Sequence, residues 1–239
     1  MRLRITRSVI PNLFTATNMF CGFLSIIEAG NGNYNYAAWL IVVAALFDAL
    51  DGLVARLTNS SSELGVELDS LSDIISFGAA PSILLYSTYF YQYNTIGIIL
   101  SSLPLIAGGF RLARFNIQLV GFEKSFFLGL PIPTSALTIT TFVLAFYDNG
   151  FTTPYSDAVI PLVAILSYLM VGNIRYETLP KISLKGIMEK PFHFAYLLAV
   201  VILVLILYKK GMFYGLILMI VIGIFRHIFY FIKKNLFNF

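Results

Sequence analysis

The sequence predicts an all-α protein, a polytopic bundle of about eight transmembrane helices. Its 239 residues are 58% hydrophobic and only 12% charged, with a mean hydropathy of +0.83. Soluble domains carry about 25% charged residues, so this composition excludes an ordinary soluble enzyme. Apolar stretches of roughly 17–25 residues, the length that crosses a bilayer as a helix, recur along the chain. Basic residues are concentrated in alternate connections between these stretches.

The expected spans follow one another with short or charged connections. They lie near residues 12–29, 34–57, 70–92, 95–115, 129–147, 155–173, 191–208 and 211–232. The basic start MRLRITR leads directly into the first span without the features of a signal peptide, so we expect the N-terminus to be retained. A long charged segment begins at residue 174. We therefore expect a six-span membrane domain over residues 1–173, followed by a charged linker and two further spans over residues 174–239.

Positive charge gives these spans a direction. Nearly all lysines and arginines outside the spans fall in the connections on one side of the membrane, and the connections on the other side contain only two, Lys209 and Lys210. Because lysine and arginine are enriched in cytoplasmic loops, we expect a multi-pass protein of the cell membrane with both termini on the cytoplasmic side. The expected cytoplasmic cations are Arg2, Arg4, Arg7, Arg56, Arg111, Arg114, Lys124, Arg175, Lys181, Lys185, Lys190, Lys233 and Lys234.

Residues 48–73, DALDGLVARLTNSSSELGVELDSLSD, put four aspartates into an otherwise apolar region. Asp48 and Asp51 are three residues apart and Asp69 and Asp73 are four apart, so each pair occupies one face of a helix. An ionised side chain at membrane depth costs on the order of 3 kcal/mol, and four like charges repel one another. Arg56 alone cannot balance four carboxylates. We therefore expect divalent cations to neutralise the cluster.

The ligand types narrow the choice of metal. Carboxylate oxygens without nearby histidine or cysteine suit Mg²⁺, Mn²⁺ or Ca²⁺ rather than zinc. Pairs of such ions about 3.5–4 Å apart recur in phosphoryl-transfer sites. Gly52, Ala55 and Gly65 leave a notch of small residues beside the acids, where a ligand can approach the backbone. Arg56 offers a bidentate fork for phosphate oxygens.

Spacing alone leaves three interpretations of the aspartates open. They can be hydrogen-bonded structural groups, a cation-transport site or a catalytic metal centre. A transporter of divalent cations needs a polar route across the membrane. The outer halves of the second and third spans, YNYAAWLIVVAALF and ILLYSTYF, are apolar, which disfavours transport. A catalytic site would lie at the cytoplasmic ends of these two spans.

The same stretch resembles the signature of the CDP-alcohol phosphatidyltransferase family. It matches the pattern D-x-x-D-G-x-x-A-R-x(8)-G-x-x-x-D-x-x-x-D with no position missing. The resemblance implies a transferase of phospholipid biosynthesis that moves a phosphatidyl group from a CDP-linked lipid to an alcohol and releases CMP. It implies that Asp48, Asp51, Asp69 and Asp73 hold two divalent cations, Mg²⁺ or Mn²⁺, and that Asp73 is the general base.

The residues around the aspartates are expected to bind the substrates. The resemblance assigns Gly52, Arg56 and Ser62 to the CDP moiety. Polar residues of the first span either line the nucleotide or acceptor pocket or cap their helix; we assign Asn18 among them to the acceptor. The expected CDP-lipid contacts are Asn12, Thr15, Gly52, Ala55, Arg56, Ser62 and Gly65.

The flanking segments resemble the phosphatidylserine synthase branch of the family. They read PNLFTATNMFCGF, SDIISFGAAPS, GGFRLARFN and FFLGLPIP, within roughly residues 8 to 135. The resemblance implies L-serine as the acceptor. Because serine carries a carboxylate, Arg111 and Arg114 are its expected anchors, with Asn116 just beyond them. The alternatives are glycerol 3-phosphate or an inositol phosphate as acceptor, or arginines that only set membrane orientation.

The resemblance also implies a homodimer. The substrates and membrane lipids are the other expected partners, and no nucleic acid is among them. No cysteine, serine or histidine is suitably placed as an alternative nucleophile, so we expect the acceptor hydroxyl to attack the lipid-linked phosphorus directly. The surface that binds the lipid tails is expected to consist of ordinary hydrophobic side chains. The sequence therefore does not predict whether the tails are joined by ester or by ether bonds.

Overall fold

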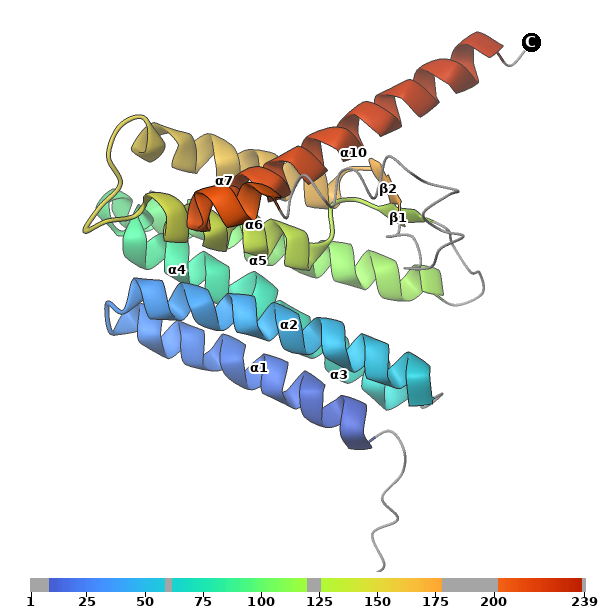
Figure 1. The fold of residues 1–239 in the computed structure, drawn as a ribbon, viewed down its shortest axis with the longest axis horizontal. Helices are drawn as coiled ribbons and strands as arrows, with labels where there is room; N and C mark the ends of the chain where they lie inside the picture. The colour runs from blue at the N-terminus through green and yellow to red at the C-terminus, as the bar shows by residue number, and fades with distance from the viewer. Residues whose placement is uncertain (1–8, 59–61, 120–125, 178–201, 238–239) are drawn as a thin grey trace, which may run out of the picture.

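A computed structural model of the chain describes residues 9–58, 62–119, 126–177 and 202–237. Most of these residues are helical, as the sequence predicts, and the helices form a bundle (Figure 1). The helices are α1 (Val9–Gly30), α2 (Tyr34–Thr58), α3 (Glu63–Asp73), α4 (Ala80–Thr88), α5 (Asn94–Leu119), α6 (Ile132–Phe146), α7 (Tyr155–Val171) and α10 (Lys209–Phe237).

Five helical stretches within the described residues are long and apolar enough to cross a membrane. They are Val9–Gly30, Tyr34–Thr58, Leu64–Thr88, Phe90–Ile117 and Lys209–Lys233. The expected fifth and sixth spans correspond to the shorter apolar helices α6 and α7, of 15 and 17 residues. Of the expected seventh span, residues 202–207 are helical, and residues 191–201 lie outside the described residues. The chain is a polytopic helical membrane protein, and the count of eight spans stays a prediction.

The third span begins earlier than the sequence predicted and is built from three segments. The segment before residue 70 was expected as a loop, but α3 begins at Glu63 because the Ser62 hydroxyl caps it by accepting a hydrogen bond from the Gly65 N–H at 3.0 Å. A π-helical segment, η1 (Ile74–Ala79), then joins α3 to α4. Single π turns inside α-helices are frequent at functional sites.

Helix α1 packs most extensively against α2 and also contacts α3 and η1. The contact with η1 is close, since a Cβ atom on Gly22 would lie 2.6 Å from the Ser76 Cα. Two hydroxyl groups of the third span donate to α1 carbonyl oxygens: Ser72 to Thr15 at 3.1 Å and Ser76 to Asn18 at 2.9 Å. These bonds fix the position of α1 along the third span.

A small antiparallel sheet accompanies the all-α bundle. Strand β1 (Phe126–Leu128), which follows α5 in the chain, pairs with β2 (Arg175–Glu177), which follows α7. A three-residue strand contains too few residues to show the alternation that marks a strand in sequence. The sheet joins two segments on the side of the bundle where α5 and α7 end (Figure 1).

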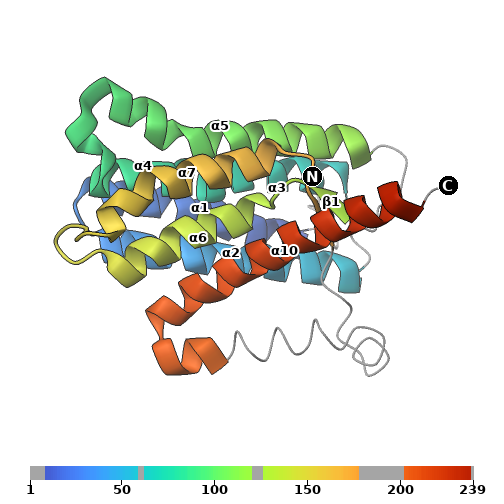
Figure 2. The ribbon, with the colours of Figure 1, turned by 90° about the horizontal axis from the view of Figure 1, so that it is seen from above.

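The opposite end of the bundle is filled by aromatic side chains. Tyr34 of α2 meets Tyr147 edge to face at 5.3 Å between ring centroids. Phe213 of α10 packs against Phe142 and Phe146 of α6 at 5.4 and 5.5 Å. Helix α10 therefore begins beside α6, and its C-terminal half projects away from the bundle (Figure 1, Figure 2).

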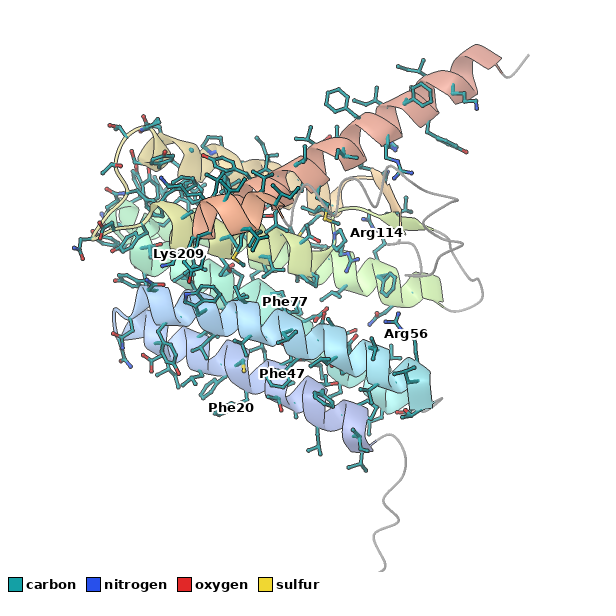
Figure 3. All side chains as sticks on the ribbon, viewed as in Figure 1. Phe20, Phe47, Arg56, Phe77, Arg114 and Lys209 are labelled. Carbon is teal, nitrogen blue, oxygen red and sulfur yellow. The ribbon has the colours of Figure 1, made fainter. Side chains whose placement is uncertain are left out.

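The helix ends that border the charged connections lie at one end of the molecule. The first turn of α1, the end of α2, the start of α3 and the last turns of α5 and α10 all lie at the right of Figure 1. Arg56 and Arg114 lie towards this end, whereas Lys209 lies in the other half of the bundle (Figure 3), with its Nζ 3.4 Å from the Asn35 Oδ1 near the start of α2. The cytoplasmic location of the right-hand end stays a prediction.

Candidate metal centre and substrate pocket

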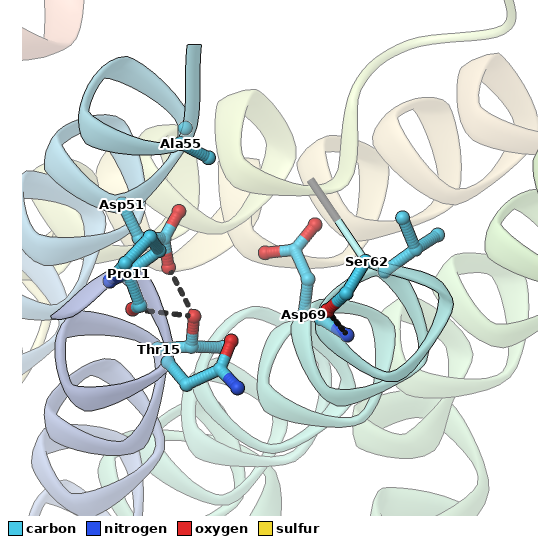
Figure 4. A pocket seen from close by; sticks show the side chains of 10 residues that line it. Pro11, Thr15, Asp51, Ala55, Ser62 and Asp69 are labelled. Carbon is cyan, nitrogen blue, oxygen red and sulfur yellow. Dashed lines mark hydrogen bonds between the residues drawn. The ribbon is translucent and has the colours of Figure 1, made fainter. Parts of the chain in front are cut away.

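Three aspartates from two helices meet near the charged end. Asp48 and Asp51 lie one turn apart on α2, and Asp69 lies on α3. One carboxylate oxygen from each lies within 4.8 Å of the others. Asp51 is buried, with 5% of its surface exposed, and it faces Asp69 across the space between α2 and α3 (Figure 4).

Asp73 occupies a different position from the other three acids. It lies at the junction of α3 with η1, is 7% exposed and falls outside the group of three. Its carboxyl group interacts electrostatically with Asp48 and with Arg111. Its Oδ1 has no hydrogen-bond partner within the described residues. Asp73 thus presents a buried acceptor oxygen next to the acidic group.

A pocket of about 120 Å³ opens beside the acids, between α1, α2 and α3 (Figure 4). Six of the seven residues expected to bind the CDP-lipid line it, and the seventh, Arg56, is exposed nearby on α2. Sequence reasoning missed Pro11 and Val66, although each is four residues from a member of the predicted set. The lining residues are Pro11, Asn12, Thr15, Asp51, Gly52, Ala55, Ser62, Gly65, Val66 and Asp69.

The two glycines of the notch serve the pocket in different ways. A Cβ atom on Gly52 would have no neighbour within 4 Å, so Gly52 borders open space. A Cβ atom on Gly65 would lie 3.1 Å from the Ser62 Oγ and 3.4 Å from the Asn12 Oδ1. A side chain at Gly65 would therefore crowd the helix cap and the wall formed by α1.

The residues expected to bind the acceptor have different surroundings, and Arg111 is the one that interacts with Asp73. Arg111 of α5 is 7% exposed, and its guanidinium lies 5.4 Å from the centre of the Phe115 ring. The Asn116 Nδ2 donates to the Ser70 Oγ at 3.0 Å, which joins α5 to α3 between the two acids of that helix. Asn18 of α1 is fully buried.

Arg114 contacts a different part of the molecule. Its guanidinium donates to the carbonyl oxygens of Val171 at 2.8 Å, Leu128 at 3.0 Å and Met170 at 3.2 Å. The last carbonyl groups of a helix have no partner within the helix, and a cation there is favourable. Arg114 therefore caps the end of α7 and ties it to β1, and its expected role in acceptor binding stays a prediction.

The acidic group fits a divalent cation. Within the described residues it consists only of carboxylates, which are hard oxygen ligands that favour Mg²⁺, Mn²⁺ or Ca²⁺. Partly buried carboxylates this close repel one another strongly, and a bound cation relieves that repulsion. Asp73, whose Oδ1 has no hydrogen-bond partner in the described part of the chain, interacts with Asp48 of this group. Asp48, Asp51 and Asp69 thus form a candidate metal centre beside an open pocket.

Comparisons with known proteins agree with this geometry. Residues 8–171 match the family model of the CDP-alcohol phosphatidyltransferases. A CDP-diacylglycerol–serine O-phosphatidyltransferase of Helicobacter pylori is 40% identical over 176 residues, 73% of this chain and 74% of the relative. An archaetidylserine synthase of Methanothermobacter thermautotrophicus is 43% identical over 169 residues, 70% and 69% of the two chains. A CDP-diacylglycerol–serine O-phosphatidyltransferase of Bacillus subtilis is 35% identical over 176 residues, 72% and 92% of the two chains.

Proposed function

The chain belongs to the CDP-alcohol phosphatidyltransferase family, and we propose that it transfers the phosphatidyl group of a CDP-linked lipid to L-serine and releases CMP. The observation that carries this proposal is the pocket between α1, α2 and α3, which opens beside Asp51 and Asp69. The similar proteins include enzymes named for diacylglycerol and for archaetidyl lipids. The donor is therefore defined here by its CDP group, with either tail chemistry.

The pocket would hold the CDP group. Ser62 and Gly65 at the start of α3 and Gly52 and Ala55 on α2 leave room for a nucleotide close to the backbone. Asn12 and Thr15 supply polar contacts from α1. Arg56 lies one turn beyond Gly52 towards the end of α2, where its guanidinium suits phosphate oxygens.

The four aspartates would hold the metal. Asp48, Asp51 and Asp69 supply the grouped oxygens, and one oxygen of the Asp73 carboxylate would complete the set, which leaves its other oxygen free to accept a proton. We propose two divalent cations, Mg²⁺ or Mn²⁺, with Ca²⁺ able to occupy the same oxygen ligands. When bound, such ions neutralise the charge of the diphosphate and of the departing CMP.

Asp73 is the proposed general base. Its buried carboxyl group keeps an unpartnered oxygen within the described part of the chain, and such an acceptor suits the hydroxyl proton of serine. The serine oxygen then forms a bond to the lipid-linked phosphorus as the bond to CMP breaks. This direct displacement predicts that no labelled phosphatidyl group remains on the protein when serine is withheld. A trapped phosphatidyl-enzyme would contradict the mechanism.

Arg111 is the proposed anchor for the serine carboxylate. Its charge interacts with Asp73, so a serine carboxylate bound to Arg111 would bring the serine hydroxyl towards the base. Asn18 and Asn116 are proposed to complete the acceptor site, since they lie on helices that contact the third span. For Arg114 we propose a structural role at the end of α7 in place of the acceptor contact expected from the sequence, because its donors reach backbone carbonyl oxygens.

The family match ends at residue 171, where α7 ends. We propose that residues 1–173 form the catalytic membrane domain and that residues 174–239 are an addition to it. The charged end, with the metal centre, is proposed to face the cytoplasm, where CDP-lipid head groups and serine are accessible. Homodimerisation stays a prediction.

An acceptor panel tests the proposed function. Purified protein is given a CDP-lipid with Mg²⁺ or Mn²⁺, and CMP release is measured with L-serine, glycerol 3-phosphate or inositol 1-phosphate. We expect release that depends on L-serine. Release with another acceptor alone would retain the metal centre and overturn the assignment of serine, whereas no metal-dependent release with any acceptor would overturn the enzymatic function.

A further inference from the structure

The hydroxyl group of Thr15 lies between two acceptors. Its Oγ1 is 2.8 Å from the Asp51 Oδ2 and 3.1 Å from the carbonyl oxygen of Pro11, one turn earlier on α1 (Figure 4). Thr15 and Asp51 are both buried, with 3% and 5% of their surfaces exposed. A hydroxyl group has one hydrogen, so it donates fully to only one of these oxygens at a time.

Thr17 shows what a threonine on α1 does without a second acceptor. Its Oγ1 donates to the carbonyl oxygen of Leu13 at 2.8 Å, the usual bond of a helical threonine to the residue four positions earlier. At Thr15 the corresponding distance is longer, and the shorter contact is to a carboxylate. Hydrogen bonds to ionised acceptors are roughly twice as strong as neutral ones. Thr15 therefore favours Asp51 over its own helix.

The backbone of Thr15 makes a second connection across the site. Its carbonyl oxygen accepts the hydrogen bond from the Ser72 Oγ, next to Asp73 on α3. The side chain of Thr15 thus holds an acid of α2, and its backbone holds the helix that carries the other two acids. Helix α1 carries no aspartate, yet this residue links both acid-bearing helices.

We propose that Thr15 is a positioning residue of the metal centre, which orients the Asp51 carboxylate for a divalent cation. This inference rests on the proposed function, because it presumes that the acids bind metal. Groups that hydrogen-bond to metal ligands fix the ligand's orientation, and their loss typically costs about 10–100-fold in metal affinity. This role is additional to the proposed contact of Thr15 with CDP, whose loss alone would leave metal binding in the absence of nucleotide unchanged.

The test measures Mn²⁺ binding to the purified full-length protein in detergent, without nucleotide, from the electron paramagnetic resonance signal of free Mn²⁺. Thr15→Val and Thr15→Ala remove the hydroxyl group with different effects on volume, and Thr15→Ser keeps it. Thr17→Val is the matched control on the same helix. We expect the Kd for Mn²⁺ to rise about 10–100-fold in both hydroxyl-free variants, to stay within a few-fold of wild type in Thr15→Ser and to be unchanged in Thr17→Val.

Three results would overturn the inference, and they are distinguishable. Wild-type affinity for Mn²⁺ in Thr15→Val and Thr15→Ala would reject the positioning role while leaving the metal centre in place. A wild-type protein that binds no Mn²⁺ would reject the metal centre of the proposed function and this inference with it. Affinity lost equally in Thr15→Ser would also reject it, because the effect would then not follow the hydroxyl group.

Discussion

The four aspartates share one chemical group and differ in their surroundings. Three bring oxygens within 4.8 Å of one another, whereas Asp73 is set at the start of the π-helical segment beside Arg111. The sequence predicted the cluster because the spacing of three and four residues places each pair on one helical face. The resemblance set Asp73 apart as the base, but the sequence did not predict its interaction with Arg111, which lies far along the chain on α5.

Replacing Asp73 tests its role as the base. We expect Asp73→Asn to lower the rate of CMP release by about 10²–10⁴-fold, the usual contribution of a general base. Glu67→Gln is the control, because Glu67 is an exposed acid on the same helix. Single-turnover CMP release with saturating L-serine measures the step. A rate for Asp73→Asn within a few-fold of wild type would contradict the assignment.

We propose different roles for Arg111, which would bind the acceptor, and Arg114, which would stabilise the fold. The spacing of three residues suggested one shared role, but long side chains on neighbouring turns reach different partners. We expect Arg111→Gln to raise the KM for L-serine by about tenfold or more, as expected for a lost charged hydrogen bond. Arg114→Gln should leave this KM unchanged and lower the unfolding temperature. Steady-state kinetics and thermal unfolding of both variants check this, and the opposite pattern would exchange the two roles.

At the scale of elements, the sequence predicted the bounds of the first two spans closely but not the division of the third span into α3, η1 and α4. Apolar length marks a span, whereas the change from α- to π-helical hydrogen bonding at Ile74 leaves no distinct pattern of hydrophobic residues. The cap at Ser62 extends α3 into a segment whose charges suggested a loop. The close approach of η1 to α1 requires Gly22, which sequence reasoning noted only as part of a motif.

A substitution at Gly22 tests this close approach. We expect Gly22→Ala to destabilise the protein by about 1–3 kcal/mol, because the added methyl group would overlap Ser76 and separate α1 from η1. Gly30→Ala is the matched control on α1, since a Cβ atom there meets nothing within 4 Å. Thermal unfolding in detergent, followed by Trp39 fluorescence, compares the two. Equal unfolding temperatures would show that α1 does not need this contact.

At the scale of the whole molecule, the pattern of charge predicted which connections lie together. The helix ends with the acids and arginines gather at one end, and aromatic side chains fill the other. The sequence did not predict how α10 packs, because the apolar residues of this helix do not by themselves identify the helix that it contacts. That packing depends on Phe213 meeting two rings of α6.

Membrane orientation is tested by labelling single cysteines. The native Cys21 is buried and should react weakly. Asn31 follows α1 at one end and Asn173 follows α7 at the other, and both are exposed. We expect an impermeant maleimide to label Asn31→Cys on intact cells and Asn173→Cys only after permeabilisation. The reverse pattern would place the metal centre on the outer side of the membrane.

The central claim is that the acids of α2 and α3 hold a divalent cation that is needed to transfer a lipid phosphate to serine. The most direct test is the incorporation of labelled L-serine into lipid by protein stripped of metal, before and after Mg²⁺ or Mn²⁺ is restored, with Asp51→Asn in parallel. We predict no product without metal, recovery on metal addition with one CMP per serine lipid, and little recovery in Asp51→Asn. Serine incorporation that persists without metal, or equals wild type in Asp51→Asn, would contradict the claim.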